Sequence, residues 1–266
     1  MVTKQYLREK FNPDGSQLRK AQLRMLELLR FIDKICVEND IDYWLDSGTL
    51  LGAERHGGFI PWDDDADICM PKDHLEKFKK VFFEKYADSS YALQCDETDS
   101  KALCPWVVLR DLKSEYIQDS DLHRRRRYRG LQVDIFPVEY NLSPMLHSLA
   151  AYLMKGMVFA PYDRKSMRWF RPFADISFRF LRKIVYPFFH LLSPFKKKFA
   201  MLSYGVPFGQ VMKLSDLYPL GHIQFEGVTL KAPNDVDAYL TEIYGDWRKI
   251  PSLDSIQTHN VDIRFF

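Results

Sequence analysis

The pattern of apolar and polar residues along this 266-residue chain predicts helices near both ends, with strands between them. Apolar side chains recur at helical spacing over residues 16–39, which indicates an amphipathic helix. Asp73 suits the N-terminus of a second helix. A closing helix is expected from about Asn234 to Tyr244, with Gly245 as its C-cap.

Shorter apolar or alternating runs predict strands, because side chains on a strand alternate between two faces. A hairpin is expected over residues 222–230, turning at Glu226-Gly227. The other expected strands are 41–45, 65–70, 91–95, 106–109 and 131–136. Between the first two of these, a helix opening at the turn Ser47-Gly48-Thr49 would aim free backbone N–H groups at an anion.

Four aspartates, Asp63, Asp64, Asp65 and Asp67, follow Pro61-Trp62 and lead into apolar residues. On a strand, Asp65 and Asp67 would share one face. Oxygen-only ligands of this kind suit Mg²⁺ or Mn²⁺. The alternative is a solvated acidic turn, which leaves the alternating apolar residues unexplained. We therefore expect a metal-dependent phosphate-transfer centre.

Other motifs for metal or phosphate chemistry are absent from the sequence. An EF-hand calcium loop needs Gly where Ile68 stands, and no GxxxxGK[ST], HExxH or GxGxxG pattern occurs. The four cysteines form no CxxC pair, so no redox or metal-finger motif follows, and we expect them to be buried small hydrophobes.

Composition is typical of a globular protein with a substantial core, with 46% hydrophobic and 28% charged residues. The length fits one large domain or a domain with an insertion. The first residues lack the apolar run of a secretion signal, and no uncharged apolar stretch reaches the roughly 18 residues of a membrane span. These observations predict a cytoplasmic protein.

Three blocks of residues resemble the LicD family of phosphotransferases, which includes bacterial phosphocholine transferases and, more distantly, fukutin and fukutin-related protein. The first block is Gly48-Thr49-Leu50-Leu51-Gly52, Arg55 and residues 60–67. The second is Val133-Asp134-Ile135-Phe136-Pro137. The third comprises Phe225-Glu226-Gly227, Pro233, Asp237, Tyr239-Leu240 and Tyr244-Gly245-Asp246-Trp247. Residues 141–204 match no known motif.

The resemblance implies an α+β fold, a nucleotidyltransferase-like mixed β-sheet with flanking helices. Residues 1–266 would form a single domain with a helical, basic-aromatic insertion at about 141–204.

The resemblance also implies roles for individual residues. Asp65, Asp67 and Asp134 would bind the metal and carry catalysis, with Asp134 also a candidate base toward the acceptor. Gly48, Thr49 and Arg55 would bind substrate. Of Asp63 and Asp64, one would have a further metal-binding role and the other would lie at the surface. Asp63 is the candidate for metal binding. Trp62 would stack on the base of the donor or simply pack.

The implied reaction moves a phospho-alcohol group, such as phosphocholine, from a CDP-linked donor to a hydroxyl of a cell-surface glycan or a lipopolysaccharide precursor, with Mg²⁺ (or Mn²⁺) as cofactor. One alternative is a nucleotidyltransferase that releases pyrophosphate, since the same metal site would serve. Another is a non-enzymatic scaffold that has kept the fold.

Two basic segments add candidate contacts. The run Arg124–Arg129 precedes the Asp134 strand and could supply a guanidinium to donor phosphate, or be a solvated loop. Residues 164–198 hold ten Lys/Arg, nine aromatic residues and one acidic residue, Asp175. This composition suits peripheral contact with an anionic membrane, here its inner face, although packed helices with solvated cations would also explain it. No motif indicates nucleic-acid binding.

Overall fold

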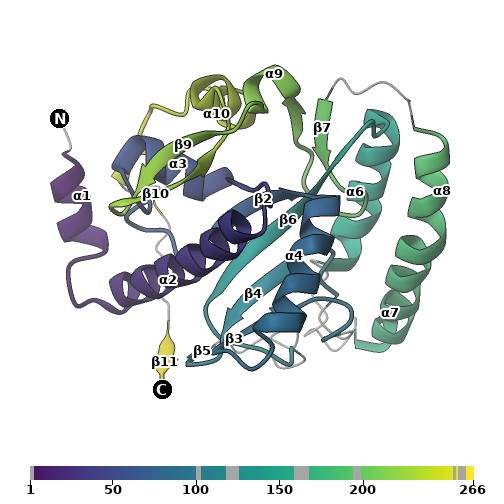
Figure 1. Cartoon of the computed structure of the whole chain (residues 1–266), viewed down its shortest axis with the longest axis horizontal. Coiled ribbons are helices and arrows are strands. Elements are labelled where there is room, and N and C mark those ends of the chain that lie inside the picture. The colour runs from purple at the N-terminus through teal and green to yellow at the C-terminus, as the bar shows by residue number, and fades with distance from the viewer. Residues whose placement is uncertain are drawn as a thin grey trace.

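The computed structural model describes residues 3–99, 103–117, 126–158, 168–193, 199–253, 256 and 262–266. A mixed β-sheet lies at its centre, flanked by helices (Figure 1). The predicted α+β fold is therefore confirmed. None of the helices in the described parts of the chain combines the length and apolar composition needed to span a bilayer.

The central sheet has the strand order β1-β2-β6-β4-β3. Strands β2 and β6 run parallel, and the other neighbours run antiparallel. The second half of β6 pairs with β7, which in turn pairs with β8. The bounds are β1 Trp44–Leu45, β2 Asp67–Pro71, β3 Tyr91–Gln94, β4 Val107–Asp111, β6 Gln132–Tyr140, β7 Phe199–Leu202 and β8 Val211–Lys213.

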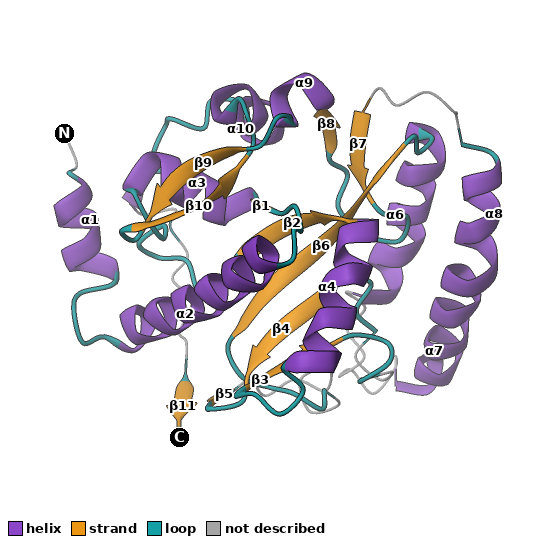
Figure 2. Ribbon diagram, viewed as in Figure 1, coloured by secondary structure: helices purple, strands orange, loops and turns teal. Residues whose placement is uncertain are grey.

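Two long helices, α2 (Gln17–Glu38) and α4 (Lys72–Lys85), cover one face of this sheet (Figure 2). Ser16 caps α2 by accepting a hydrogen bond from the N–H of Arg19 at 3.1 Å. Val133 and Ile135 of β6 are fully buried in the core. Because side chains alternate along a strand, Asp134 and Phe136 point to the opposite face.

The predicted hairpin is present as β9 (Gly221–Phe225) and β10 (Val228–Ala232). Its turn residues Glu226 and Gly227 both have positive φ. The Glu226 carboxylate accepts two hydrogen bonds from Arg19 of α2, at 3.0 and 2.7 Å, and one from the N–H of Phe59 at 3.2 Å. The turn therefore ties α2 to the loop that follows α3 (Ser47–His56).

The remaining elements lie around this frame. Near the N-terminus is α1, and α10 ends at Gly245, which has positive φ as expected of its C-cap. Their bounds are α1 Lys4–Phe11, β5 Ser114–Tyr116, α9 Leu214–Leu217, α10 Val236–Tyr244 and β11 Ile263–Phe265, with β11 paired to β5.

Three strand predictions need correction. The strand expected over 65–70 is β2, which begins only at Asp67, where pairing with β6 starts, so Asp65 lies in the preceding loop and does not share a strand face with Asp67. The strand expected over 41–45 is reduced to Trp44–Leu45, because only these residues pair with β2. Strand β6 extends beyond residue 136 because β7 provides a partner for its second half.

The stretch 141–204 is mainly helical and lies at one side of the sheet (Figure 1). It contains α6 (Pro144–Val158), the short helix η1 (Arg168–Phe170), α7 (Arg171–Phe180), a π-helical turn at Leu181–Val185 and α8 (Tyr186–Leu191). Its last residues form β7 of the central sheet. The single-domain boundaries stay a prediction. Lys196, Lys197 and Lys198 lie outside the described residues.

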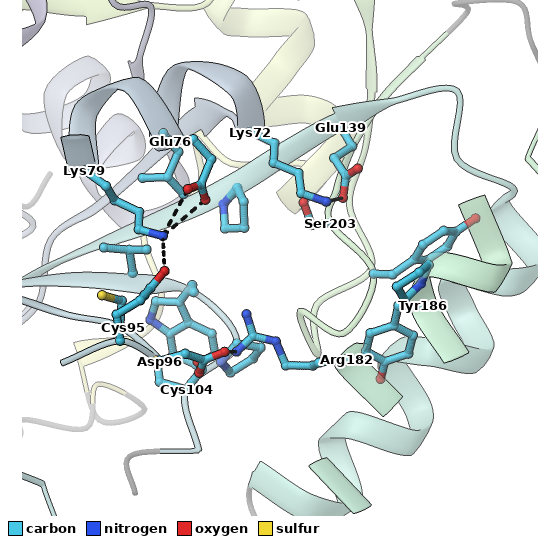
Figure 3. A pocket seen from close by; sticks show the side chains of 18 of the residues that line it. Lys72, Glu76, Lys79, Cys95, Asp96, Cys104, Glu139, Arg182, Tyr186 and Ser203 are labelled. Carbon is cyan, nitrogen blue, oxygen red and sulfur yellow. Dashed lines mark hydrogen bonds and ion pairs between the residues drawn. The ribbon is translucent and has the colours of Figure 1, made fainter. Parts of the chain in front are cut away.

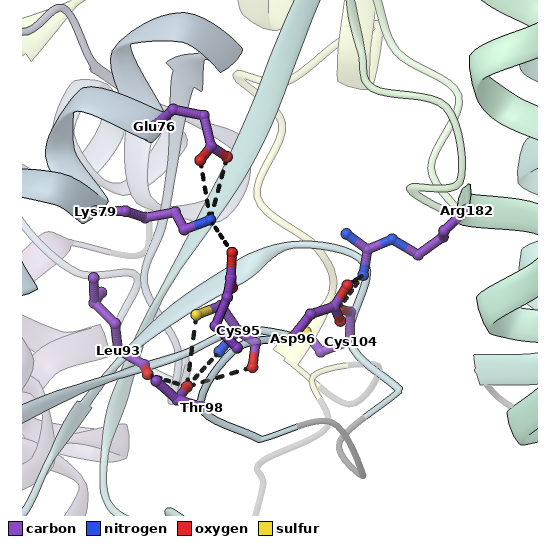
Figure 4. A network of polar contacts seen from close by, with 9 residues as sticks. Glu76, Lys79, Leu93, Cys95, Asp96, Thr98, Cys104 and Arg182 are labelled. Atoms are coloured by element: carbon purple, nitrogen blue, oxygen red, sulfur yellow. Dashed lines mark hydrogen bonds and ion pairs between the residues drawn. The ribbon is translucent and has the colours of Figure 1, made fainter. Parts of the chain in front are cut away.

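A cavity of about 310 Å³ lies where the π-helical turn and α8 meet α4 and the β3–β4 connection (Figure 3). Arg182 crosses it to pair with Asp96 at 2.7 Å and donates a hydrogen bond to the carbonyl of Cys104 at 3.4 Å (Figure 4). On the other wall, Lys79 pairs with Glu97 at 2.7 Å. The two contacts of Arg182 therefore fasten the inner side of the helical segment to the body of the protein.

Candidate active site

The register between β2 and β6 places Asp67 directly beside Asp134 on neighbouring parallel strands. The amide of Gln132, on the same side of β6, donates to both carboxylate oxygens of Asp134, at 3.1 and 3.0 Å. Two carboxylates predicted from separate motifs are therefore adjacent in the fold, on the face that α2 and α4 leave uncovered.

The first turn of α3 holds Asp67 in place. The hydroxyl of Thr49 is buried and accepts a hydrogen bond from the N–H of Asp67 at 2.8 Å. The N-cap residue Asp46 makes no side-chain capping bond. Its carboxylate instead accepts from the hydroxyl of Tyr239 at 2.7 Å and the amide of Gln210 at 3.2 Å. The first-turn amides of α3 are thus not capped by the side chain of Asp46 and can face an anion.

The loop before β2 brings the other carboxylates over the start of α3. A side chain at Gly48 would put its Cβ 2.8 Å from Oδ2 of Asp63, so glycine allows this close approach. Asp64 accepts a short hydrogen bond from the hydroxyl of Tyr116. Asp65 is exposed. The acidic run is therefore divided, with Asp63 and Asp65 near the helix and Asp64 bound to β5.

These groups surround an open pocket of about 510 Å³. Gly48, Arg55, Trp62, Asp63, Asp65 and Asp67 all contribute to its wall, together with Tyr244, Asp246 and Lys249 from the C-terminal block. Thr49 and Asp134 are buried and do not line this pocket, but both adjoin Asp67, Thr49 through its hydrogen bond and Asp134 through the strand register. Of the site residues predicted from the sequence, Gly48, Arg55, Asp63, Asp65 and Asp67 therefore line one pocket, and their roles stay predictions.

Crowding of carboxylates shifts their pKa values. Burial, and then the neighbouring charge of Asp65, raise the pKa of Asp63 to about 8. The same causes raise the pKa of Asp67 well above its ordinary value. Burial raises the pKa of Asp134 to about 6, against the opposing charge of Arg110. Negative charge in the pocket is therefore incompletely balanced by the protein itself.

This donor set fits a divalent cation in its chemistry, because all the ligands are carboxylate oxygens and their repulsion is what a bound cation relieves. Among the described residues, no group of three or more His, Cys, Asp or Glu side chains is already arranged as a metal site. Cation binding would therefore have to draw the exposed Asp65 toward the pair on β2 and β6.

Two arginines, Arg55 and Arg126, contribute positive charge to the site. Arg55 donates to the backbone carbonyl of Trp247 at 3.1 Å, which holds its guanidinium at the pocket wall. The charge of Arg126 lowers the pKa of Asp134, an effect smaller than the rise caused by burial. Its buried Nε has no hydrogen-bond partner among the described residues.

The other arginines of that run take different places. Arg127 stacks over Tyr128 at 5.2 Å, and Arg129 pairs with Glu115 at 3.1 Å. Arg124 and Arg125 lie outside the described residues. Trp62 packs edge-on against Phe11, with ring centroids 5.3 Å apart, so packing is the contact that the structure shows for it.

Sequence reasoning missed several residues of the site. Burial raises the pKa of Tyr244, and the charges of Asp46 and the pocket carboxylates raise it further, so this phenol faces the acidic cluster. Lys249 is a second cation at the pocket wall. Asp46 could have been found, because aspartate before a Ser-Gly-Thr turn is a common N-cap. Tyr244 stands in the third block that resembles the family but was given no role in the site, and Lys249 lies outside the three blocks.

Comparison with known proteins adds independent information. A family model described as "LicD/FKTN/FKRP, nucleotidyltransferase domain" matches residues 40–183. The chain is 27% identical to lipopolysaccharide cholinephosphotransferase LicD of Haemophilus influenzae, over 92% of this chain and 96% of that protein. Shorter matches are to human ribitol 5-phosphate transferase FKRP (45% identity over 16% of this chain and 8% of that protein) and to mannosyltransferase regulator 4 of Saccharomyces cerevisiae (38% over 27% and 6%).

Proposed function

This chain belongs to the LicD family, and from that membership we propose that it is a phosphotransferase acting on a hydroxyl of a cell-surface glycan or a lipopolysaccharide precursor. The observation that carries the proposal is the pairing of Asp67 with Asp134 beside the open first turn of α3. The similarity to a lipopolysaccharide cholinephosphotransferase along nearly the whole chain supports the choice of reaction.

For the donor we propose a CDP-linked alcohol such as CDP-choline. A diphosphate needs hydrogen-bond donors and positive charge, and the pocket offers the first-turn amides at Gly48 and Thr49 with Arg55 and Lys249 at its wall. Arg126, beside Asp134, is a third candidate cation. The donor phosphates would thus lie between the start of α3 and the acidic loop.

For the cofactor we propose Mg²⁺, or Mn²⁺, held by Asp65, Asp67 and Asp134, with Asp63 as a further candidate ligand. When bound, the cation neutralises charge on the diphosphate as the bond to the leaving group breaks. Thr49 fixes the backbone of Asp67, and Gln132 orients the carboxylate of Asp134. Asp134 is also the candidate base that accepts the proton of the acceptor hydroxyl.

For the location we propose the cytoplasm, at the inner face of the membrane. A lipid-linked glycan precursor is anchored there, so an enzyme that modifies it must reach the bilayer surface. We assign this contact to residues 164–198, which are rich in basic and aromatic side chains.

Product analysis tests the proposed reaction. Incubation with Mg²⁺ and CDP-choline should release CMP together with a phosphocholine-modified acceptor. In a parallel incubation with CTP in place of CDP-choline, transfer of the nucleotide with release of pyrophosphate would instead identify a nucleotidyltransferase. Absence of any product with CDP-choline, CDP-ribitol and further CDP-alcohols, each supplied with lipopolysaccharide precursor, would favour a scaffold that has kept the fold.

A further inference from the structure

A row of exposed apolar side chains runs along η1, α7, the π-helical turn and α8. The residues follow one another at steps of three or four, so they lie on one side of the helical rod. Each is between 55% and 78% exposed. We call this row the apolar stripe, and it consists of Trp169, Phe173, Ile176, Phe180, Ile184, Phe188 and Leu191.

The π-helical turn at Leu181–Val185 helps to keep the stripe on one side. Steps of four residues, as from Phe180 to Ile184 and Phe188, would drift around a regular α-helix of 3.6 residues per turn. A π-helical turn holds more residues than an α-helical one, and this offsets the drift.

The opposite side of the same rod is fixed to the protein. Phe178, Tyr186 and Phe189 are buried in a small apolar cluster with residues of α6 and β7. Arg182 reaches from the rod to Asp96 on the body at 2.7 Å (Figure 4). The rod therefore cannot turn its stripe inward without breaking these contacts. In the described chain, the stripe is a large apolar surface facing solvent, which usually marks an interaction site.

Charges beside the stripe select the kind of partner. Arg179 and Lys183 are exposed on the same rod, and Asp175 is the only acidic residue between 168 and 193. Association of two copies through the stripe would bring these cations against the same cations of the other copy. An anionic bilayer offers both an apolar interior and a complementary charge. The indole ring of Trp169 also suits the headgroup region.

We propose that the apolar stripe docks on an anionic lipid bilayer, with α7 and α8 lying along the membrane plane. Apolar side chains would enter the boundary between headgroups and acyl chains, while Arg179 and Lys183 would meet lipid phosphates. This docking deepens the proposed function. It rests on that function in one respect, because modification of a lipid-linked acceptor is the reason for the protein to reach a membrane. The docking itself can be tested without turnover.

Vesicle co-sedimentation of the full-length protein tests the proposal. Wild type should bind vesicles of phosphatidylcholine mixed with phosphatidylglycerol more tightly than phosphatidylcholine alone, and binding should weaken with added salt. The double variant Ile176→Ser/Phe180→Ser should bind at least about tenfold more weakly, because two apolar side chains no longer enter the bilayer. Arg179→Gln and Lys183→Gln should each weaken binding to anionic vesicles about fivefold.

The matched control is Val37→Ser/Phe83→Ser, which removes exposed apolar side chains from α2 and α4, away from the stripe. It should bind vesicles as wild type does, and circular dichroism should be unchanged for both double variants. Wild type that fails to bind anionic vesicles would overturn the proposal, as would equal binding by the stripe variant. A dimer in sedimentation equilibrium that is lost in the stripe variant, without vesicle binding, would identify the stripe as a self-association surface instead.

Discussion

Asp67 is the residue at which the parts of the site meet. Its backbone N–H is held by Thr49, its neighbour across the sheet is Asp134, and its side chain faces the pocket. Its carboxylate is therefore fixed from α3 and β6 at once. Residues placed in this way by several elements make defined contributions, which single substitutions can measure.

Asp67→Asn should abolish turnover while the fold stays intact, because the change removes a negative ligand without changing side-chain volume. We expect a loss in kcat of at least about a hundredfold, the effect of removing one preorganised stabilising group. Asp65→Asn and Asp134→Asn should behave alike. The measurement is CMP release from CDP-choline, with circular dichroism as the check on folding. Wild-type activity in any of the three would remove that residue from the site.

Thr49→Val should leave the buried N–H of Asp67 without an acceptor. We expect the free energy of unfolding to fall by about 1–3 kcal/mol and kcat to fall with it, because Asp67 loses its support. Thr49→Ser keeps the hydroxyl and is the matched control. Denaturant titration and turnover measure the two effects. A valine variant as active as the serine variant would show that this hydrogen bond does not position Asp67.

At the residue scale, sequence motifs located the carboxylates but not their supports. Asp65, Asp67 and Asp134 stand in dense local patterns. In the structure Asp65 and Asp67 line one pocket, and Asp134 lies beside Asp67 on the neighbouring strand. Tyr244 and Lys249 come from far along the chain, where no local spacing signals contact with the acidic loop. Only the packing of α10 against α3 brings them to the pocket.

At the scale of elements, α3 and the loop that follows it set the position of the acidic run. Gly52 lies where α3 crosses this loop, and a Cβ there would come 2.4 Å from the carbonyl oxygen of Gly58 and 2.9 Å from the N–H nitrogen of Ile60. Both are backbone atoms, so the loop itself would have to move. The helix and the aspartates are thus coupled through this contact.

Gly52→Ala should therefore displace the loop that carries Asp63 and Asp65, and both the melting temperature and kcat should fall. Gly156→Ala in α6 is the control, since nothing lies within 4 Å of a Cβ there. That variant should gain up to about 1 kcal/mol from higher helix propensity. Thermal denaturation and turnover of the two variants provide the comparison. Equal stability and activity would show that the loop is not held by this close approach.

Periodicity predicted most of the elements, because the helices and the hairpin carry complete local signals. Gly245 and the turn at Glu226-Gly227 both act as their sequence context suggested. The start of β2 could not be predicted in this way. Whether Asp65 belongs to β2 depends on the residue at which β2 begins to pair with β6. This starting point is set by tertiary structure.

At the scale of the whole molecule, the acidic pocket should make stability depend on pH. The pKa of Asp63 is about 8 and that of Asp134 about 6, whereas both carboxyls titrate near pH ~4 in an unfolded chain. Between these values the folded state binds more protons than the unfolded state. Stability is therefore fully present at low pH and is lost as pH rises through this window.

We expect the melting temperature in chelator to fall as pH rises from about 4 to about 8, where the folded protein releases these protons. Added Mg²⁺ should restore stability, and more so at the higher pH. Asp63→Asn should flatten the dependence, whereas Asp14→Asn, on an exposed residue, should not. Thermal denaturation across this pH range checks both effects. An identical pH profile with and without Mg²⁺ would count against a cation in this pocket.

The most direct test of the central claim is Mn²⁺ binding measured by electron paramagnetic resonance in the presence of CDP-choline. Wild type should bind Mn²⁺, and Mg²⁺ should compete for the same site. Asp67→Asn and Asp134→Asn should lose this binding, while Asp14→Asn retains it. Failure of the wild type to bind, or unchanged binding in both pocket variants, would contradict a metal-dependent centre built on these carboxylates.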